Sequence, residues 1–430
     1  MRASFDAIIV GAGPAGSSAA ILLARAGWSV VLVEKQDFPR RKVCGECIAA
    51  SNLPLLEALG LGSAFAASAG PELRSVVFMH GQRSVEAALP AAAQAPYRWG
   101  RALGRETLDS LLLEQARLAG ALVLQPWAVQ SIEGAPGDWC CELRARGTGL
   151  AQRLRAPIVI DAHGSWEALA SGRPQRAPVR GAHDLLAFKA NFRGASLDQG
   201  VLPVLSFTGG YGGMVVADSA LTTVACCIRR DRLDALRRAA PGVGAGAVVE
   251  AMLKRECAGV QRALHGATRD GPWLGAGPIA PGIRVDHDDG LFRIGNAAGE
   301  AHPILGEGIS MALQSAWLLC AQLLGGAQRA PAPGAHWQRE VARAYTRQWR
   351  RVFGPRLRLA AVFARLAMHP RGAALLLALL RAWPGLLTRG AAWGGKVRCA
   401  ADPAAIGLRE LVSVRDATPA AVTNFASRPS

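Results

Sequence analysis

The chain has 430 residues, of which 50% are hydrophobic, and it carries a formal net charge of +17 at pH 7. This length and apolar content predict a globular protein of two or three domains and exclude a largely disordered chain. The nine cysteines are odd in number and scattered, which argues against a disulfide framework and favours a reducing, cytoplasmic location.

The positive charge leaves three interpretations open. The first is binding to nucleic acid. No such partner is expected, because the basic residues are mainly arginines spread along the chain and no nucleic-acid-binding motif occurs among them. The second interpretation is contact with an acidic membrane surface, and the third is a compositional bias toward arginine. The first predicted strand begins close to Met1, which leaves no room for a signal peptide, and no apolar run reaches the ~20 residues that span a bilayer.

A buried strand, a glycine-rich turn, a helix and a second buried strand are predicted at the start of the chain. Residues 5–10, apart from Asp6, and residues 30–33 are apolar, as parallel strands covered on both faces are, and residues 17–26 predict the helix between them. Glu34 and Lys35 follow the second strand directly. The turn contains Gly11, Gly13, Pro14, Ala15 and Gly16.

This spacing indicates that the chain binds a dinucleotide. Gly11 permits the tight turn, Gly13 lets a pyrophosphate approach the backbone, and Gly16 allows the helix to pack closely on the strand. The helix N-terminus offers N–H donors and the positive end of the helix dipole to the phosphates. The carboxylate of Glu34 is placed to accept hydrogen bonds from a ribose diol. A glycine-rich turn with no ligand is the alternative.

The middle of the chain predicts two kinds of sheet. Residues 121–124 and 156–161 continue the buried parallel pattern, and residues 105–119 carry apolar side chains at helical spacing. Residues 186–193 alternate apolar and polar side chains, and residues 214–228 predict a hairpin, as is typical of an antiparallel sheet. We therefore expect an α/β protein with a Rossmann-type parallel-sheet domain, an antiparallel-sheet substrate domain and a C-terminal helical region.

A second ligand-binding pattern occurs at residues 294–309. There a strand ends, the chain passes through small residues, and a helix starts at Gly306-Glu-Gly308. Small residues allow the backbone to lie against a flat ligand, and the helix start supplies N–H donors where that ligand is negatively charged. The N1–C2=O edge of a reduced flavin carries such a charge.

Taken in order, three motifs make the chain resemble the FAD-dependent monooxygenases of the aromatic-hydroxylase type and the related geranylgeranyl reductases, over about residues 5–325. The first is the glycine turn with Glu34. The second is the sequence Arg105-x-x-Leu-Asp109, and the third is the segment 295–309, which is similar to the family's G-D-A-A-G…P…G-E-G-I motif. Val129 occupies the position at which the family contacts adenine through its backbone.

The resemblance implies that FAD is the cofactor and that Arg105 reaches its flavin side. Asn296 stands where the family has an aspartate that binds the ribityl hydroxyls, and an amide both donates and accepts hydrogen bonds. No second G-x-G-x-x-G occurs, so NAD(P)H visits the FAD site or an external reductase protein delivers the electrons. The implied cofactor-binding residues are Gly11, Gly13, Pro14, Ala15, Gly16, Glu34, Lys35, Arg105, Val129, Asn296, Gly306, Gly308 and Ile309.

The resemblance and the changes of pattern together divide the chain into domains. The FAD-binding domain is expected at residues 1–165, with a small insertion of the substrate domain near 70–100, and it resumes at residues 285–327. The substrate domain occupies residues 166–284, and the helical region occupies residues 335–430.

No residue pattern identifies a catalytic acid, a base or a metal site, because the flavin carries the redox chemistry in such enzymes. Cys44, Tyr211 and Pro303 are the candidates for the wall of the active-site pocket. Cys44 and Cys47 form a C-x-x-C, which is either a redox pair or, as the resemblance implies, part of the wall beside the flavin ring. His163 either faces a nicotinamide or is a surface turn residue.

The resemblance implies a monooxygenase that hydroxylates or epoxidises a hydrophobic small molecule, such as an alkyl phenol, a polyketide or a lipid-like compound, through a flavin C4a-hydroperoxide. A reductase of isoprenoid double bonds is the first alternative. A non-catalytic protein that binds prenylated partners on the same fold is the second. The related halogenases are disfavoured, because their W-x-W-x-I-P motif is absent from this sequence.

Apolar and aromatic residues recur every four positions in the C-terminal region, with arginines between them. One interpretation is a helical cap on the FAD-binding domain, because amphipathic helices usually pack on a core. The other is an interfacial surface that contacts an anionic membrane and admits a hydrophobic substrate. In that case the cytoplasmic protein is also peripheral to a membrane. The recurring residues are Trp337, Val341, Tyr345, Trp349 and Phe353.

Overall fold

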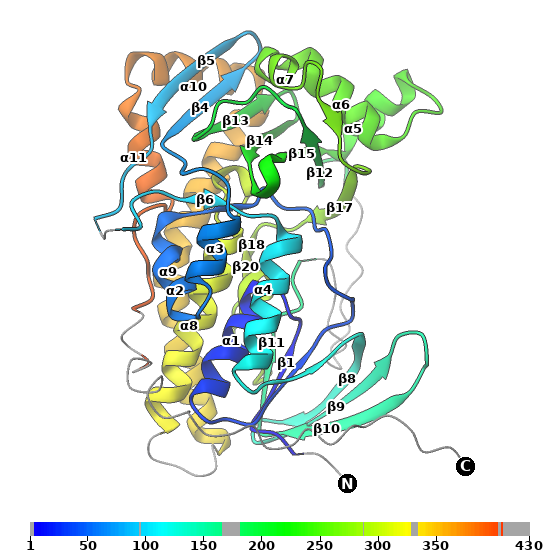
Figure 1. Cartoon of the computed structure of the whole chain (residues 1–430), viewed down its shortest axis with the longest axis vertical. Helices are drawn as coiled ribbons and strands as arrows, with labels where there is room; N and C mark the ends of the chain where they lie inside the picture. The colour runs from blue at the N-terminus through cyan, green and yellow to red at the C-terminus, as the bar shows by residue number, and fades with distance from the viewer. Residues whose placement is uncertain are drawn as a thin grey trace.

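The structure, a computed structural model, describes residues 4–93, 96–165, 181–286, 288–327, 334–402 and 406. The predicted α/β class is confirmed. A parallel sheet lies toward one end of the long axis, a large antiparallel sheet lies toward the other, and long helices run along one side (Figure 1). The predicted domain ranges also include residues 166–180 and 407–430, which lie outside the described part of the chain.

The parallel sheet has five strands in the order β19-β11-β1-β2-β7. Its central strands are buried along their whole length, as expected for parallel strands covered on both faces. The second strand, Val30–Val33, has the predicted bounds. The strands are β1 (Ala7–Val10), β2 (Val30–Val33), β7 (Leu122–Leu124), β11 (Ile158–Asp161) and β19 (Phe292–Arg293).

Alternate side chains of β1 enter two different cores. Ala7 and Ile9 pack with three helices, whereas Ile8 and Val10 pack with a three-stranded antiparallel sheet on the other face. The helices are α1 (Pro14–Arg25), α4 (Arg105–Leu118) and α8 (Gly308–Ala327). The covering strands are β8 (Trp127–Ala135), β9 (Asp138–Ala145) and β10 (Ala151–Ala156). This two-sided cover fixes the glycine turn at the carboxyl end of β1.

The second large sheet has eight strands in the order β16-β12-β15-β14-β13-β4-β5, with β17 also paired to β12. β13 was not predicted, and β14 begins at Gly210 rather than Met214 because its glycines adopt extended backbone. β4 pairs in parallel with β13. The strands are β4 (Ser75–His80), β5 (Arg83–Ala88), β12 (Leu185–Arg193), β13 (Val201–Phe207), β14 (Gly210–Val216), β15 (Thr222–Arg229), β16 (Thr268–Arg269) and β17 (Leu274–Ile279).

Three helices complete the fold at the C-terminal end. They are α9 (Ala335–Met368), α10 (Pro370–Ala382) and α11 (Gly385–Trp393). Tyr345, Trp349 and Phe353 are each no more than 1% exposed and belong to the main core. The recurring aromatic residues are therefore a packing face, which agrees with the helical-cap interpretation and excludes this face from membrane contact. Pro355 lies inside α9 without ending it, on the exposed side of the helix.

One helix corrects the expectation that no apolar run approaches the length of a bilayer span. Residues 308–325 of α8 are long and apolar enough to cross a membrane, but 72% of that stretch is buried inside the protein. α9 and α10 meet the same criterion only if they are taken together, and they are bent by 110° at their junction. α8 is thus a core helix, packed between α1 and α9.

Short elements connect these layers. The helices among them are α2 (Leu53–Ala58), α3 (Gly62–Ser68), α5 (Arg230–Ala239), α6 (Ala245–Glu256) and α7 (Ala258–Ala263). The strands among them are β3 (Cys47–Ile48), β6 (Arg101–Ala102), β18 (Gly282–Ile283) and β20 (Gly299–Glu300). α5, α6 and α7 belong to the layer that packs on one face of the antiparallel sheet.

Candidate active site

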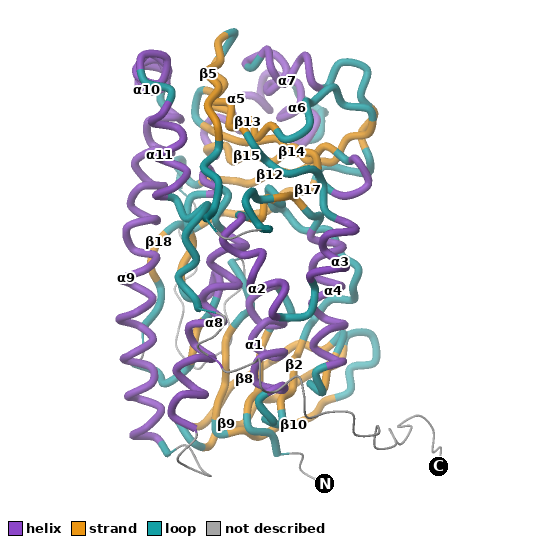
Figure 2. Tube along the Cα trace, turned by 60° about the vertical axis from the view of Figure 1, so that its left-hand side comes forward, coloured by secondary structure: helices purple, strands orange, loops and turns teal. Residues whose placement is uncertain are grey.

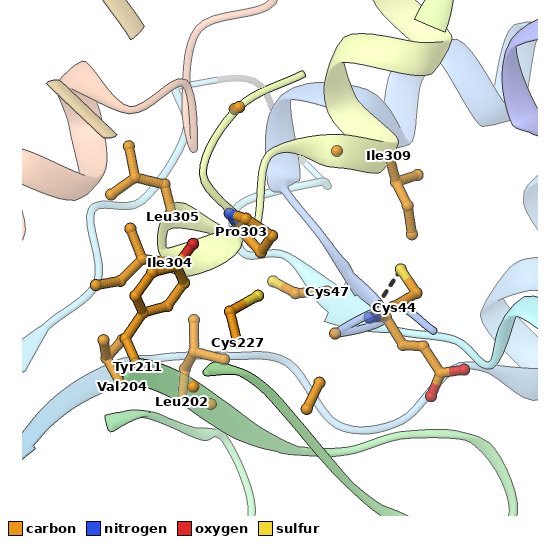
Figure 3. Close-up of a pocket in the computed structure, with 18 of the residues that line it drawn as sticks. Cys44, Cys47, Leu202, Val204, Tyr211, Cys227, Pro303, Ile304, Leu305 and Ile309 are labelled. Atoms are coloured by element: carbon orange, nitrogen blue, oxygen red, sulfur yellow. Dashed lines mark hydrogen bonds between the residues drawn. The ribbon is translucent and has the colours of Figure 1, made fainter. Parts of the chain in front are cut away.

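A cavity of about 430 Å³ runs from the glycine turn after β1, past the start of α8, to the space between the antiparallel sheet and α9–α11. Figure 3 shows part of it, with side chains from the Cys44–Cys47 segment, β13, β14 and the start of α8 around one open space. Eleven of the predicted site residues lie in its wall. They are Gly13, Pro14, Ala15, Cys44, Arg105, Tyr211, Asn296, Pro303, Gly306, Gly308 and Ile309.

The glycine turn has the shape that a pyrophosphate requires. Gly11 has a φ of +102°, and a Cβ there would lie 2.5 Å from the carbonyl oxygen of Ala162. A Cβ at Gly16 would lie 1.8 Å from the oxygen of Gly11, so helix and turn touch. Gly13 instead lines the cavity, and a Cβ there would meet only the Arg105 guanidinium, at 3.7 Å. No side chain caps the N-terminus of α1, which leaves its N–H groups available to an anion.

Glu34 is held against this turn at the end of β2. Its Oε2 accepts a hydrogen bond from the Ala12 N–H at 2.9 Å, and its Oε1 accepts one from the Gln36 N–H at 3.0 Å. Lys35 follows it and, like Glu34, is outside the cavity wall. Val129 also lies outside the wall, on β8, where it pairs with Leu143 of β9 and packs under the parallel sheet.

Three cations surround the open side of the glycine turn. Arg105 donates two hydrogen bonds of 2.7 Å to Asp109, as the predicted R-x-x-L-D spacing places them one helical turn apart. Arg40 lies 3.6 Å from the same carboxylate and 3.8 Å from that of Glu34. Lys42 lines the cavity, and its burial, together with the charges of Arg105 and Arg40, lowers its pKa to about 8.

Arg40 and Lys42 were not predicted as site residues. The available signal was the basic turn Arg40-Arg41-Lys42 soon after the acidic residue of the second strand. Positive charge at the mouth of a phosphate-binding turn is what a pyrophosphate requires. The shape of the turn and these charges together fit the adenosine diphosphate half of a dinucleotide such as FAD.

Glu46 joins the Cys44–Cys47 segment to α4 and to the antiparallel sheet. It is 2% exposed and has a left-handed φ of +58°. One of its oxygens accepts the Arg105 N–H at 2.9 Å and contacts the Lys189 ammonium of β12, and the other accepts the hydroxyl of Thr223 on β15. This buried carboxylate therefore fixes the cavity wall where α4 meets the antiparallel sheet. The resemblance placed the segment beside the flavin ring, but Glu46 was not predicted as a site residue, because its partners are far away along the chain.

The loop before α8 forms the opposite wall. Asn296 donates to Ser165 Oγ at 2.6 Å, and Gly306 is in the left-handed conformation with a φ of +62°. Lys396, from the segment after α11, donates to the Gly306 carbonyl at 3.3 Å and lies 3.4 Å from the Glu307 carboxylate. Arg356 of α9 lies 3.7 Å from the other oxygen of Glu307. The predicted flavin loop is thus tied to the C-terminal helices by charge.

Tyr211 and His302 form a polar pair at the cavity. The Tyr211 hydroxyl lies 3.1 Å from His302 Nδ1, and the two rings meet edge to face with centroids 6.1 Å apart. Burial, with Arg365 nearby, lowers the pKa of His302 to about 4, and burial holds the pKa of Tyr211 well above its usual value. Both side chains are therefore neutral near pH 7. His302 was not predicted, although it is adjacent to the predicted Pro303.

The alternatives for Cys44 and His163 can now be compared with their surroundings. Cys44 and Cys47 are free thiols that line the cavity, and burial raises the pKa of Cys47, which opposes the thiolate chemistry of a redox pair. His163 is outside the cavity wall and contacts Asp161 in its own turn, which favours the turn interpretation. No cluster of three metal-ligating side chains occurs within the described residues.

Comparisons with known proteins agree with this geometry. The FAD binding domain family matches residues 4–331. Tryptophan 2-halogenase from Chondromyces crocatus is 25% identical over 347 residues, which cover 75% of this chain but only 62% of the halogenase. The chain therefore spans less than two thirds of that curated relative.

Two solved structures share the fold over nearly their whole length. The chondrochloren halogenase of a myxobacterium has a TM-score of 0.73 at 19% identity, over 95% of this chain and 96% of that one. A geranylgeranyl bacteriochlorophyll reductase-like protein from Thermoplasma acidophilum has a TM-score of 0.71 at 16% identity, over 97% of both chains. These similarities show a shared fold, and together with the family match they agree with the resemblance to the monooxygenase and geranylgeranyl reductase superfamily. Because the family match covers most of the sequence, the chain belongs to the FAD binding domain family and is an FAD-dependent oxidoreductase.

Proposed function

We propose that this oxidoreductase is an oxygen-dependent enzyme that hydroxylates or epoxidises a mostly apolar small molecule, such as an alkyl phenol or a polyketide. The observation that supports the proposal is the continuity of the cavity, which joins the predicted cofactor residues to an apolar chamber. Leu376, Leu380 and Leu387 line that chamber and are at most 8% exposed. An apolar substrate loses water there while its reactive end faces the cofactor loop.

Bound FAD supplies the redox chemistry and the activation of oxygen. In our proposal the glycine turn and Glu34 hold its adenosine end, and Arg40, Lys42 and Arg105 neutralise the pyrophosphate. Asn296 binds the ribityl chain, and the 306–309 segment holds the flavin edge. The electrons come from NAD(P)H at the same site or from an external reductase.

The Tyr211–His302 pair gives the proposed substrate a hydrogen-bond acceptor. With the proton of His302 on Nε2, its Nδ1 accepts a hydrogen bond from the Tyr211 hydroxyl, and the tyrosine oxygen accepts one from a substrate hydroxyl. Because the pKa of His302 is lowered to about 4, the imidazole does not take up the substrate proton near pH 7. The hydrogen bond instead orients the substrate and shifts electron density from its O–H bond toward the ring or double bond, which becomes more open to electrophilic attack.

Halogenation is the second candidate, and the similarity to tryptophan 2-halogenase over 75% of the chain favours it. The absence of the W-x-W-x-I-P motif stands against it. An apolar chamber and an electron-rich substrate serve both reactions. Reduction of an isoprenoid double bond is supported by the fold alone, through the reductase-like neighbour.

One set of reactions separates the three chemistries. The FAD-loaded protein is given NADPH, or an added flavin reductase, with a long-chain alkyl phenol or an isoprenoid alkene, under ¹⁸O₂ or argon and with or without bromide. We expect substrate-dependent oxygen uptake of about one O₂ per NADPH and one ¹⁸O atom in the product. A brominated product would replace our proposal with halogenation. Turnover under argon with a saturated product would replace it with reduction.

A further inference from the structure

The outer side of α10, α11 and the end of α9 exposes large apolar side chains, and we call it the α10–α11 face. In Figure 2, α10 and α11 lie beside one end of α9, at the edge of the antiparallel sheet that includes β5. Most large apolar side chains of the fold are buried, so this grouping is unusual. The exposed residues are Val362 (57%), Leu366 (38%), Leu375 (67%), Leu379 (40%), Trp383 (62%) and Trp393 (70%).

The same helices carry an excess of positive charge. Between residues 341 and 401 the sequence has twelve Lys and Arg and no Asp or Glu. Four of these arginines are exposed on the end of α9, on α10 and on α11, and none of the four forms an ion pair within the described residues. They are Arg365, Arg371, Arg381 and Arg389. A mixture of exposed tryptophan, leucine and arginine is typical of a helix that lies in a membrane interface.

The cavity opens on this face. Leu379, Arg389 and Trp393 line the cavity and are also exposed on the outside. Further in, the wall continues through the buried leucines of α10 and α11. An apolar molecule that leaves a bilayer at this point can therefore reach the cavity without crossing water.

We propose that the α10–α11 face docks on an anionic lipid bilayer and takes an amphiphilic substrate from it into the cavity. The substrate class rests on the proposed function, whereas the docking rests on the face itself. Charge complementarity selects the anionic surface, because each Lys or Arg near it raises the partition about fivefold. The exposed tryptophan and leucine side chains insert into the apolar part of the membrane interface, which adds binding that charge alone does not provide.

The test is co-sedimentation of the FAD-loaded full chain with vesicles of neutral phosphatidylcholine or of phosphatidylcholine with phosphatidylglycerol. Salt is set at about 0.01 M and about 1 M, where the Debye length is about 30 Å and 3 Å. We expect binding to anionic vesicles at low salt, weakened at high salt, and little binding to neutral vesicles. Arg371→Gln with Arg381→Gln, and Leu375→Ser with Trp383→Ser, should each lower the partition at least tenfold.

Two matched controls show whether the face matters. Arg343→Gln with Arg347→Gln removes two exposed charges from the distant half of α9, and Leu118→Ser removes an apolar side chain that is 72% exposed on α4. Both are expected to bind like the wild type. The proposal would be overturned if the protein did not bind anionic vesicles at low salt, or if the control variants lost as much vesicle binding as the variants of the α10–α11 face. It would also be overturned if the protein bound an acidic carrier protein but no vesicle. Normal vesicle binding without any turnover would contradict the proposed function and leave the docking standing.

Discussion

The buried ion cluster of Glu307, Arg356 and Lys396 tests how the C-terminal segment holds the predicted cofactor loop. The Glu307 side chain is 1% exposed, and its two oxygens lie 3.4 Å from Lys396 Nζ and 3.7 Å from Arg356 Nη1. Neither oxygen makes an aligned hydrogen bond within the described residues. The two cations are therefore its main compensation for lost solvation. Lys396→Met removes one cation and keeps most of the side-chain volume.

We expect Lys396→Met to lower the free energy of unfolding by about 3 kcal/mol, the lower end of the range for breaking a buried ion pair, because Arg356 stays in place. Burial already raises the pKa of Glu307, and Lys396 and Arg356 oppose that rise. Losing Lys396 raises it further, so the folded state holds the proton more tightly than the unfolded state does. The loss of stability therefore grows as the pH rises above 4.5, the ordinary value for a glutamate, and through the folded pKa.

The pH-dependent loss of stability is measured by thermal unfolding of the FAD-loaded protein at about pH 5 and about pH 8.5, followed by flavin fluorescence and circular dichroism. The double variant Glu307→Gln with Lys396→Met should recover part of the loss, because no unpaired carboxylate remains and Arg356 keeps its hydrogen bonds to Gln314 and to the Arg398 carbonyl. A wild-type unfolding temperature for Lys396→Met at the higher pH would refute the reasoning. So would a double variant as unstable as the sum of the single variants.

Three further outcomes are expected. Gly13→Val places a branched side chain on the cavity side of the turn, so the folded protein should lose FAD by absorbance, and stoichiometric flavin would contradict the placement. Tyr211→Phe removes one hydrogen bond to the substrate and should lower kcat about tenfold with full FAD content; an unchanged kcat would remove the pair from the mechanism. Because the folded pKa of His302 is lowered to about 4 from 6.5, wild-type stability falls as the pH drops through that window. His302→Asn should flatten this fall in the unfolding temperature, and an unaltered slope would show that another group titrates.

Sequence reasoning succeeded where local rules dictate the structure. The bounds of β2 match the prediction, and α4 occupies residues 105–118 where a helix over 105–119 was predicted, because a β-branched run and a period of 3.6 are clear local signals. Gly11 and Gly16 follow the same logic, since a Cβ at either position would meet backbone. The Arg105–Asp109 pair is one helical turn apart, so its contact is implied by spacing alone.

The rest depends on contacts between distant parts of the chain. Glu46 meets Lys189 and Thr223, which are 143 and 177 positions away, and no local pattern marks such a partner. β13 was missed because Pro203 breaks the alternation of its apolar residues. The pairing of β4 with β13 is parallel and long-range, so neither segment by itself indicates it.

The C-terminal region shows how a correct local pattern leads to a wrong surface. The aromatic stripe of α9 predicted an amphipathic helix, and Trp349 and Phe353 do lie on one face, but that face is buried against α8. The exposed apolar side chains lie on α10, α11 and the end of α9, whose short segments have no stripe of comparable length. α9 and the following segment also supply Arg356 and Lys396, beyond the family match at residues 4–331. The region outside that match therefore holds the predicted cofactor loop through ion pairs and also forms part of the wall of the proposed substrate chamber. Substitutions there are expected to change substrate range and cofactor environment together.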